Sequence, residues 1–243
     1  MLLGIIADLH ANLEATDAVL RQLDLVRPER VICLGDITGY YANPNEVVER
    51  VRERNIQMLM GNHDSAVCGL EEPWFFNENA QAAIEWQAQR LLPEHREWLR
   101  TVPGELRVDS DTLAVHGAPG NRDDYIVDWL DAMRHLEYLA RQNVKVCFFG
   151  HSHRASMLSE RGSLMRKNGS GKYDISPFTR YFINPGSVGQ PRDRDPRAAF
   201  GVYDTEKRVF EFFRVPYDIE LAARKVLDAG LPAQLARRLA EGR

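Results

Sequence analysis

Cysteine is scarce in this sequence, and the cysteines that are present form no pattern. There are three among 243 residues, an odd number without CxxC spacing. This excludes a disulfide framework and favours a reducing compartment. Cys33 and Cys147 lie in the apolar runs VICLG and VCFFG, where a reduced, buried thiol is the expected state.

Long apolar runs and a strong charge of one sign are also missing. No segment approaches the roughly 20 apolar residues that a membrane helix needs, so we expect no membrane partner. The N-terminal run MLLGIIA is short and has no basic start, which is not a secretory signal and leaves the cytoplasm as the expected location. A net charge of −4 argues against a nucleic-acid partner and against a DNA nuclease.

The composition is that of an ordinary globular protein. Hydrophobic residues make up 44% and charged residues 27% of the chain. A chain of this size can bury a full core without disulfides or metals to staple it. No internal repeat, low-complexity run or linker divides it. The sequence therefore predicts one domain over 1–243, and it leaves the oligomeric state open.

The first part of the chain alternates short apolar runs with segments of helical periodicity. We expect buried strands over 2–7, 31–34 and 56–60, separated by helices over 12–26 and 45–54. Pro44 suits the first turn of the second helix. This rhythm implies parallel strands joined by right-handed crossovers.

The second part of the chain does not keep this strand–helix alternation. A helical insert is expected at about 65–103, and it is followed by a hairpin, a helix, a buried strand, several short strands and two closing helices. The expected bounds are 78–90 and 93–100 for helices of the insert, 105–108 and 112–115 for the hairpin, 128–141 for the helix, 144–149 for the buried strand, 155–213 for the short strands with a turn at 168–171, and 218–228 and 232–239 for the last helices.

Polar side chains of the kinds that bind metals follow five of the predicted strands, at the point where each strand ends. They are Asp8, His10, Asp36, Asn62, His63, His116, His151 and His153. Because ligand sites gather at the carboxyl ends of strands in α/β sheets, we expect these groups to meet in one crevice. Five of the seven histidines belong to this set. Imidazole and carboxylate together favour zinc, manganese, iron, nickel or cobalt over calcium or magnesium.

The order of the motifs, D-x-H, GD, GNHD, HG and GHSH, resembles the calcineurin-like metallophosphoesterase superfamily. The segments GDITGYYANPNEVV and NPGSVGQPRDRDPRAAF are similar to its small bacterial and archaeal phosphoesterase branch. This resemblance implies an α/β fold, a four-layer α/β/β/α sandwich of two mixed β-sheets flanked by helices.

The resemblance also implies two divalent metal ions, manganese first, with iron, zinc, nickel or cobalt as alternatives. One ion would be held by Asp8, His10, Asp36 and His153, and the other by Asp36, Asn62, His116 and His151. Two cations roughly 3.5–4 Å apart can clamp the attacking and leaving oxygens of an in-line displacement, and they lower the pKa of a bound water toward about 7. A hydroxide that bridges the metals is then the expected nucleophile, with His63 assisting the leaving group.

Further residues have two interpretations each. Asp64 either orients His63 or caps a helix. Asn12 either contacts the phosphate or caps the helix that follows it. Arg154 and Arg192 are candidates for binding substrate anions, because a guanidinium group pairs bidentately with phosphate; the alternative for each is a solvated surface charge.

The expected function is the hydrolysis of small phosphate esters. Phosphodiesters or nucleotide-type substrates come first, and a phosphomonoesterase or dinucleoside polyphosphate hydrolase is the alternative. The GD motif continues as Ile37-Thr38-Gly39-Tyr40 and not as the x-x-Asp-Arg-Gly run of the superfamily's protein phosphatases, which argues against that role. A catalytically inactive scaffold of the same fold is disfavoured, because no ligand residue is lost.

Overall fold

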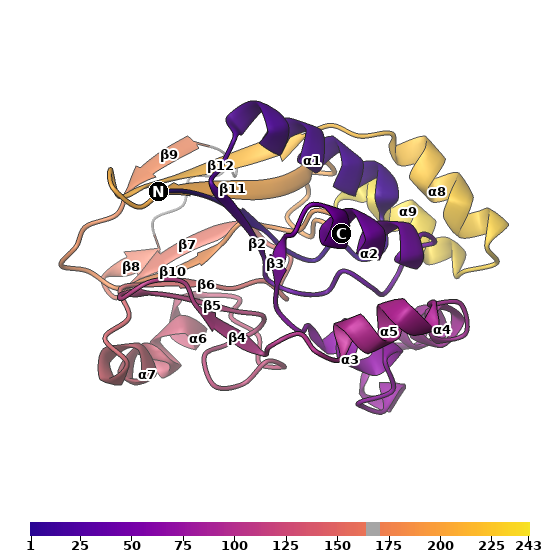
Figure 1. Ribbon diagram of the computed structural model, residues 1–243, viewed down its shortest axis with the longest axis horizontal. Helices are drawn as coiled ribbons and strands as arrows, with labels where there is room; N and C mark the ends of the chain where they lie inside the picture. The colour runs from indigo at the N-terminus through magenta and orange to yellow at the C-terminus, as the bar shows by residue number, and fades with distance from the viewer. Residues whose placement is uncertain (164–170) are drawn as a thin grey trace.

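Two six-stranded sheets lie face to face in this protein, with helices outside them (Figure 1). The computed structural model describes residues 1–163 and 171–243, apart from the side chain of Phe75. The first sheet contains, in order, β3 (Gln57–Met58), β2 (Arg30–Cys33), β1 (Leu2–Ile6), β11 (Ala198–Asp204), β12 (Val209–Val215) and β9 (Gly171–Asp174). The second contains β4 (Glu105–Arg107), β5 (Thr112–Val115), β6 (Val146–Phe148), β10 (Tyr181–Asn184), β7 (Ser156–Ser159) and β8 (Gly162–Ser163).

Both sheets are mixed. In the first, β1 is parallel to β2, and β2 to β3, while β11 runs antiparallel to β1. In the second, β5 and β10 are both parallel to β6, while β4 and β7 pair antiparallel with their neighbours. The predicted parallel pairing of the first three strands is confirmed, and so is the sandwich of two mixed sheets.

The helices form the outer layers (Figure 1). They are α1 (Leu13–Val26) and α2 (Pro44–Glu53) on the first sheet, with α8 (Ile219–Asp228) and α9 (Ala233–Glu241) beside α1, and α6 (Trp129–Arg134) and α7 (Leu136–Arg141) on the second sheet. The segment between β3 and β4 holds α3 (Asn62–Val67), the 3-10 helix η1 (Pro73–Phe75), α4 (Glu78–Ala88) and α5 (Pro93–Leu99). The helical content predicted for 65–103 is therefore present.

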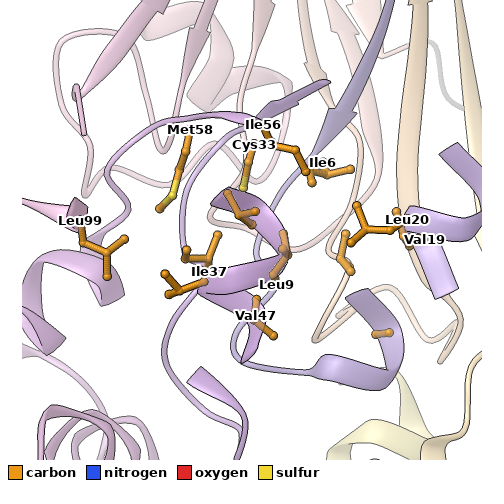
Figure 2. Close-up of a cluster of buried hydrophobic side chains, with 14 of the residues drawn as sticks. Ile6, Leu9, Val19, Leu20, Cys33, Ile37, Val47, Ile56, Met58 and Leu99 are labelled. Carbon is orange, nitrogen blue, oxygen red and sulfur yellow. The ribbon is translucent and has the colours of Figure 1, made fainter. Parts of the chain in front are cut away.

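Alternation along the strands divides the core into layers. Successive side chains of a strand face opposite sides of the sheet. Ile5 accordingly packs between the two sheets with Phe148, whereas Ile6 packs beneath α1 with Val19. Figure 2 shows part of this outer layer, where side chains from β1, β2, α1 and α2 meet. Buried apolar area on both faces explains why the strands read as continuous apolar runs.

The start and end of α1 follow from local chemistry. The Asn12 side chain accepts a hydrogen bond from the backbone N–H of Ala15, which satisfies a donor that the first turn would leave unpaired. At the other end Arg27 adopts a left-handed conformation with φ of 56°, and its N–H donates to the carbonyl of Leu23. The capping interpretation of Asn12 is confirmed.

Two predicted elements differ from the structure. The helix expected over 128–141 is interrupted at His135, whose φ of −101° separates α6 from α7. The strand expected over 56–60 pairs only through Gln57 and Met58, since the chain then turns into the GNHD motif. Of the turn expected at 168–171, residues 168–170 lie outside the described part of the chain. The division into one domain stays a prediction. None of the helices in the described ranges combines the length and apolarity that crossing a bilayer takes.

Candidate metal centre

The strand-end loops bring the predicted ligands together in two adjoining groups. Asp8, His10, Asp36 and His153 form the first, and Asp36, His116 and His151 form the second; within each group the candidate ligand atoms lie within 4.8 Å of one another. All of these residues are buried. They come from the loops after β1, β2, β5 and β6, so both sheets contribute. Asp36 belongs to both groups.

Three imidazoles are held in the same way. The Nδ1 atoms of His10, His116 and His153 lie 2.7–2.8 Å from the backbone carbonyls of Thr38, Leu34 and Gln190 respectively. Because a carbonyl only accepts, each Nδ1 carries the proton and donates it. In the neutral ring, each Nε2 then keeps a lone pair directed into the site. This is the arrangement that orients histidines that bind metal.

The distances between these nitrogen and oxygen atoms indicate which kind of ligand the site can bind. The Nε2 atoms of His10 and His153 lie 3.0 Å apart, and the Nε2 of His116 lies 3.0 Å from the side-chain oxygen of Asn62. Lone pairs facing one another at such distances repel unless a cation lies between them. The Oδ2 atoms of Asp8 and Asp36 are buried and have no hydrogen-bond partner in the described structure. This donor set fits divalent cations, with Asn62 joining the second group.

His151 presents its other nitrogen. Its Nε2 lies 3.3 Å from the carbonyl of Asp123, which leaves Nδ1 for the site. Its backbone N–H donates to Oδ1 of Asp8 at 3.0 Å, so it also fixes a ligand of the other group. The two groups are therefore coupled by a hydrogen bond as well as by Asp36.

The electrostatics of the cluster keep most of the ligands in a form that binds metal. Burial lowers the pKa of His10 and His153 well below the usual value and that of His151 to about 3, so these imidazoles are neutral at pH 7. Burial opposes ionisation of Asp36, but His116 and His63 hold the pKa of that carboxyl well below its usual range. Burial likewise opposes charge on His116, whereas Asp36 raises its pKa to about 9. A metal ion would take the place of that proton.

Backbone strain is concentrated in the same loops. Non-glycine residues with positive φ are Asp8, His10, Ala11, Asp36, Tyr40, His151 and His153 in these loops, and they include five of the predicted ligands. A left-handed conformation costs such residues free energy, so it persists only where the surroundings enforce it. This clustering marks the strand ends as the functional part of the fold.

Gly61 shows how tightly the shared carboxylate is enclosed. A Cβ on this residue would lie 2.0 Å from Oδ1 of Asp36, so only glycine leaves room for it. That same oxygen accepts a hydrogen bond of 2.9 Å from the backbone N–H of His63. The GNHD motif therefore fixes the Asp36 carboxylate through Gly61 and the His63 N–H, and it also supplies Asn62 to the site.

Asp64 positions Asp36 and does not contact the His63 ring through any hydrogen bond in the described structure. Its carboxylate accepts from the backbone N–H of Asp36 at 2.7 Å, from the backbone N–H and hydroxyl of Thr38 at 2.9 and 2.8 Å, and from the N–H of Gly61 at 3.2 Å. Of the two interpretations from sequence, the geometry supports the capping one, since Asp64 accepts from Gly61 at the start of α3. Asp64 also accepts hydrogen bonds from the loop after β2.

His63 lies between the metal-ligand groups and a cavity. Its ring meets the edge of Phe76 at 4.7 Å between centroids and lies 4.6 Å from the ring of Tyr40. Its Nδ1 is buried and has no hydrogen-bond partner among the described residues. Burial lowers the pKa of His63 to about 4. His63 is also one of the residues that line the cavity.

This cavity, of about 730 Å³, opens over the second metal-ligand group. Asn62, His63 and His151 form its floor, and Arg192 lies in its wall. The Arg192 guanidinium donates to the hydroxyl of Tyr40 at 3.0 Å and to the side-chain oxygen of Gln190 at 2.8 Å, so it is held in place.

The other substrate-binding candidates lie elsewhere. Arg154 is exposed and is not one of the described residues that line the cavity. Asn12 is only 1% exposed, and its amide also donates to the carbonyl of Gly189, so neither end of its side chain is free for a substrate. Sequence reasoning missed Tyr125, which stacks on His151 at 3.8 Å between centroids. It lies in an irregular loop with no periodicity to mark it.

Two packed sheets that join buried carboxylates and imidazoles at their strand ends define a metal-dependent hydrolase. Residues 1–208 match the calcineurin-like phosphoesterase superfamily domain, and the chain belongs to this superfamily. It is a metal-dependent phosphoesterase, and the recognition made from the motifs is confirmed.

Individual relatives share the sequence or the fold over almost their whole length. The chain is 35% identical to an uncharacterised protein of Methanocaldococcus jannaschii, over all of this chain and 98% of the relative. The crystal structure of a metallophosphoesterase from Sphaerobacter thermophilus has 37% identity and a TM-score of 0.85, covering 100% of this chain and 99% of that one. A hypothetical protein from Pyrococcus horikoshii has the same fold at 20% identity, with a TM-score of 0.81 over 100% and 98% of the two chains.

Proposed function

We propose that this protein is a phosphodiesterase that acts on small nucleotide-type substrates in the cytoplasm with two divalent ions, manganese first. The observation that carries the proposal is that Asp36 belongs to both buried ligand groups. A shared carboxylate allows two cations to lie close together despite their mutual repulsion. The adjoining cavity of about 730 Å³ has room for a substituent on the phosphate as large as a nucleoside, which is compatible with a nucleotide-type diester.

One set of residues would hold the ions, and another would bind the substrate. Asp8, His10 and His153 would hold one ion, Asn62, His116 and His151 the other, and Asp36 both. When bound, such ions polarise the phosphoryl oxygens and make a nucleophilic water available at neutral pH.

The chain's own residues orient the ester. Arg192, fixed by Tyr40 and Gln190, is placed to pair with a non-bridging phosphoryl oxygen. His63 faces the cavity beside the ligand groups and is placed to donate a hydrogen bond to the leaving oxygen.

Turnover after chelation and reloading tests the proposal. We expect bis-p-nitrophenyl phosphate to be hydrolysed faster than p-nitrophenyl phosphate, with manganese restoring more activity than zinc, nickel, cobalt or iron. A monoesterase would reverse the first preference. An inactive scaffold would show no metal-dependent turnover of either ester.

The role of His63 is tested by the leaving group. We expect His63→Ala to lower kcat on an alkyl diester about 100-fold and to change it far less on a p-nitrophenyl ester, since a good leaving group needs no proton. Equal effects on the two esters would contradict the proposed assistance. Phe178→Ala, which changes a residue 82% exposed and not among those lining the cavity, is the control.

A further inference from the structure

A second set of residues that line the cavity, outside the metal-ligand groups, has a composition of its own. We call it the outer wall and define it by Glu71, Glu72, Trp74, Asp123 and Tyr125. The first three lie in the segment between α3 and α4, and the last two lie in the loop after β5. Two segments distant in sequence thus enclose the space above the reacting centre.

The charge of the outer wall is negative. It carries three carboxylates, whereas the only cation among the described residues that line the cavity is Arg192, which donates to Tyr40 and also interacts with the Tyr125 hydroxyl. Arg122, behind the wall, forms ion pairs with Glu71 and Asp123. No ion pair holds Glu72 within the described ranges, so its charge faces the cavity uncompensated. A second anionic group on the substrate would meet like charge there.

The aromatic surface of the outer wall is continuous with the reacting centre. Tyr125 stacks on His151, with 29° between the rings, and remains 51% exposed. Trp74 lines the same cavity and is 64% exposed. Large aromatic side chains kept this accessible beside a buried metal centre offer flat surfaces for stacking.

We propose that the outer wall binds the base of a nucleoside esterified to the scissile phosphate, and that it rejects substrates whose outer group carries a further phosphate or carboxylate. The inference rests on the proposed function and names the substrate class within it. Aromatic faces stack on any nucleobase, and the carboxylates of Glu72 and Asp123 accept hydrogen bonds from exocyclic amino groups. Dinucleoside polyphosphates, with their chain of charged phosphates, are disfavoured for the same reason.

The size of the cavity also selects among uncharged and cationic groups. An aromatic surface with nearby carboxylates attracts a quaternary ammonium group as well. The cavity of about 730 Å³ is in the range that encloses a drug-sized ligand, far larger than a trimethylammonium head. A nucleoside matches both the volume and the flat faces.

The test is a set of diesters that share the p-nitrophenyl leaving group and differ in the second substituent: methyl, adenosine 5′, choline and carboxyethyl. With the manganese-loaded protein, we expect kcat/KM to be highest for the adenosine ester and lowest for the carboxyethyl ester. Trp74→Ala should lower the adenosine-to-methyl ratio of kcat/KM about ten-fold, while Trp74→Phe should retain most of it. Glu72→Gln should raise the carboxyethyl-to-methyl ratio about five-fold.

The controls and contrary outcomes are defined by these ratios. Phe178→Ala should leave every ratio unchanged. The inference is overturned if Trp74→Ala leaves the adenosine-to-methyl ratio intact, if the choline ester exceeds the adenosine ester, or if the carboxyethyl ester is the preferred substrate.

Binding of adenosine to the chelated protein, measured by calorimetry, separates the two levels of failure. If the protein shows no metal-dependent turnover but binds adenosine, and Trp74→Ala weakens that binding, the proposed reaction is contradicted and the base-binding wall is supported. Turnover of the methyl ester without such binding would support the reaction and refute the wall.

Discussion

The metal-ligand groups and the outer wall of the cavity are adjacent, but they differ in burial and in the structural elements that carry them. His10 in the first is fully buried and fixed by a backbone carbonyl, whereas Trp74 in the outer wall is 64% exposed. The ligands follow strands of the two sheets, and the wall belongs to irregular segments that those sheets carry. From this difference we expect the strand-end loops to set the chemistry and the outer wall to set the selectivity.

Removing the shared carboxylate should have the largest effect. Asp36→Asn keeps the shape of the side chain and removes its charge from both ligand groups. We expect kcat to fall about 1,000-fold and metal content to drop, because several kcal/mol of Lewis-acid stabilisation depend on both ions. Metal analysis and kcat on bis-p-nitrophenyl phosphate measure this. Asp24→Asn, at a surface ion pair with Arg54, is the control. Full metal content and rate in Asp36→Asn would refute the sharing of this ligand.

Weakening the support beneath that carboxylate should have an intermediate effect. Asp64→Asn places an amide where four hydrogen bonds are accepted, so at least one buried donor loses its acceptor. We expect metal affinity, measured by competition with a chelator, to fall about 10- to 100-fold. Thr38→Val removes only one of these bonds, costs about 1 kcal/mol and should change affinity less. Equal affinities in Asp64→Asn and the parent would show that the ligand groups do not depend on this support.

Loosening the outer wall should have the smallest effect. Arg122→Gln breaks the ion pairs with Glu71 and Asp123, which are partly exposed and worth about 0–1 kcal/mol. We expect kcat/KM to change less than about five-fold, with kcat and metal content unaltered. If Arg122→Gln lowered metal affinity as far as Asp64→Asn does, the separation between scaffold chemistry and loop selectivity would be wrong.

Much of the fold could be predicted because its signals are local. The helix after Asn12 was visible as a capping residue followed by apolar positions at helical spacing, and the structure has both. The interruption at His135 was not visible in the sequence, because the apolar spacing continues through it: Ala132 of α6 and Leu139 of α7 both pack against the second sheet. The short pairing of β3 escaped prediction for a similar reason, since the apolar run extends beyond the paired residues.

The site was predictable where residue type and position coincide. Each residue of the two buried groups is of a type that binds metal and follows a strand, so the motifs contain all of these candidate ligands. The arginines had no such signal, and only the structure separates Arg192, which lines the cavity, from Arg154, which is exposed. Asp64 belongs to the GNHD motif, yet most of its hydrogen bonds run to Asp36 and Thr38, which neither interpretation from the sequence included.

The sequence alone determined the chemistry of this protein, because the identity and order of carboxylates and imidazoles after apolar strands are properties of the chain itself. Tertiary structure decided the rest. It set the 3.0 Å distance between the Nε2 atoms of His10 and His153 and the hydrogen bond from the Asp36 N–H to Asp64. It also placed Trp74 and Tyr125 in the lining of one cavity. These residues are far apart in sequence or lie in loops without periodicity. Such contacts depend on how the two sheets and their loops pack, and no local pattern encodes that.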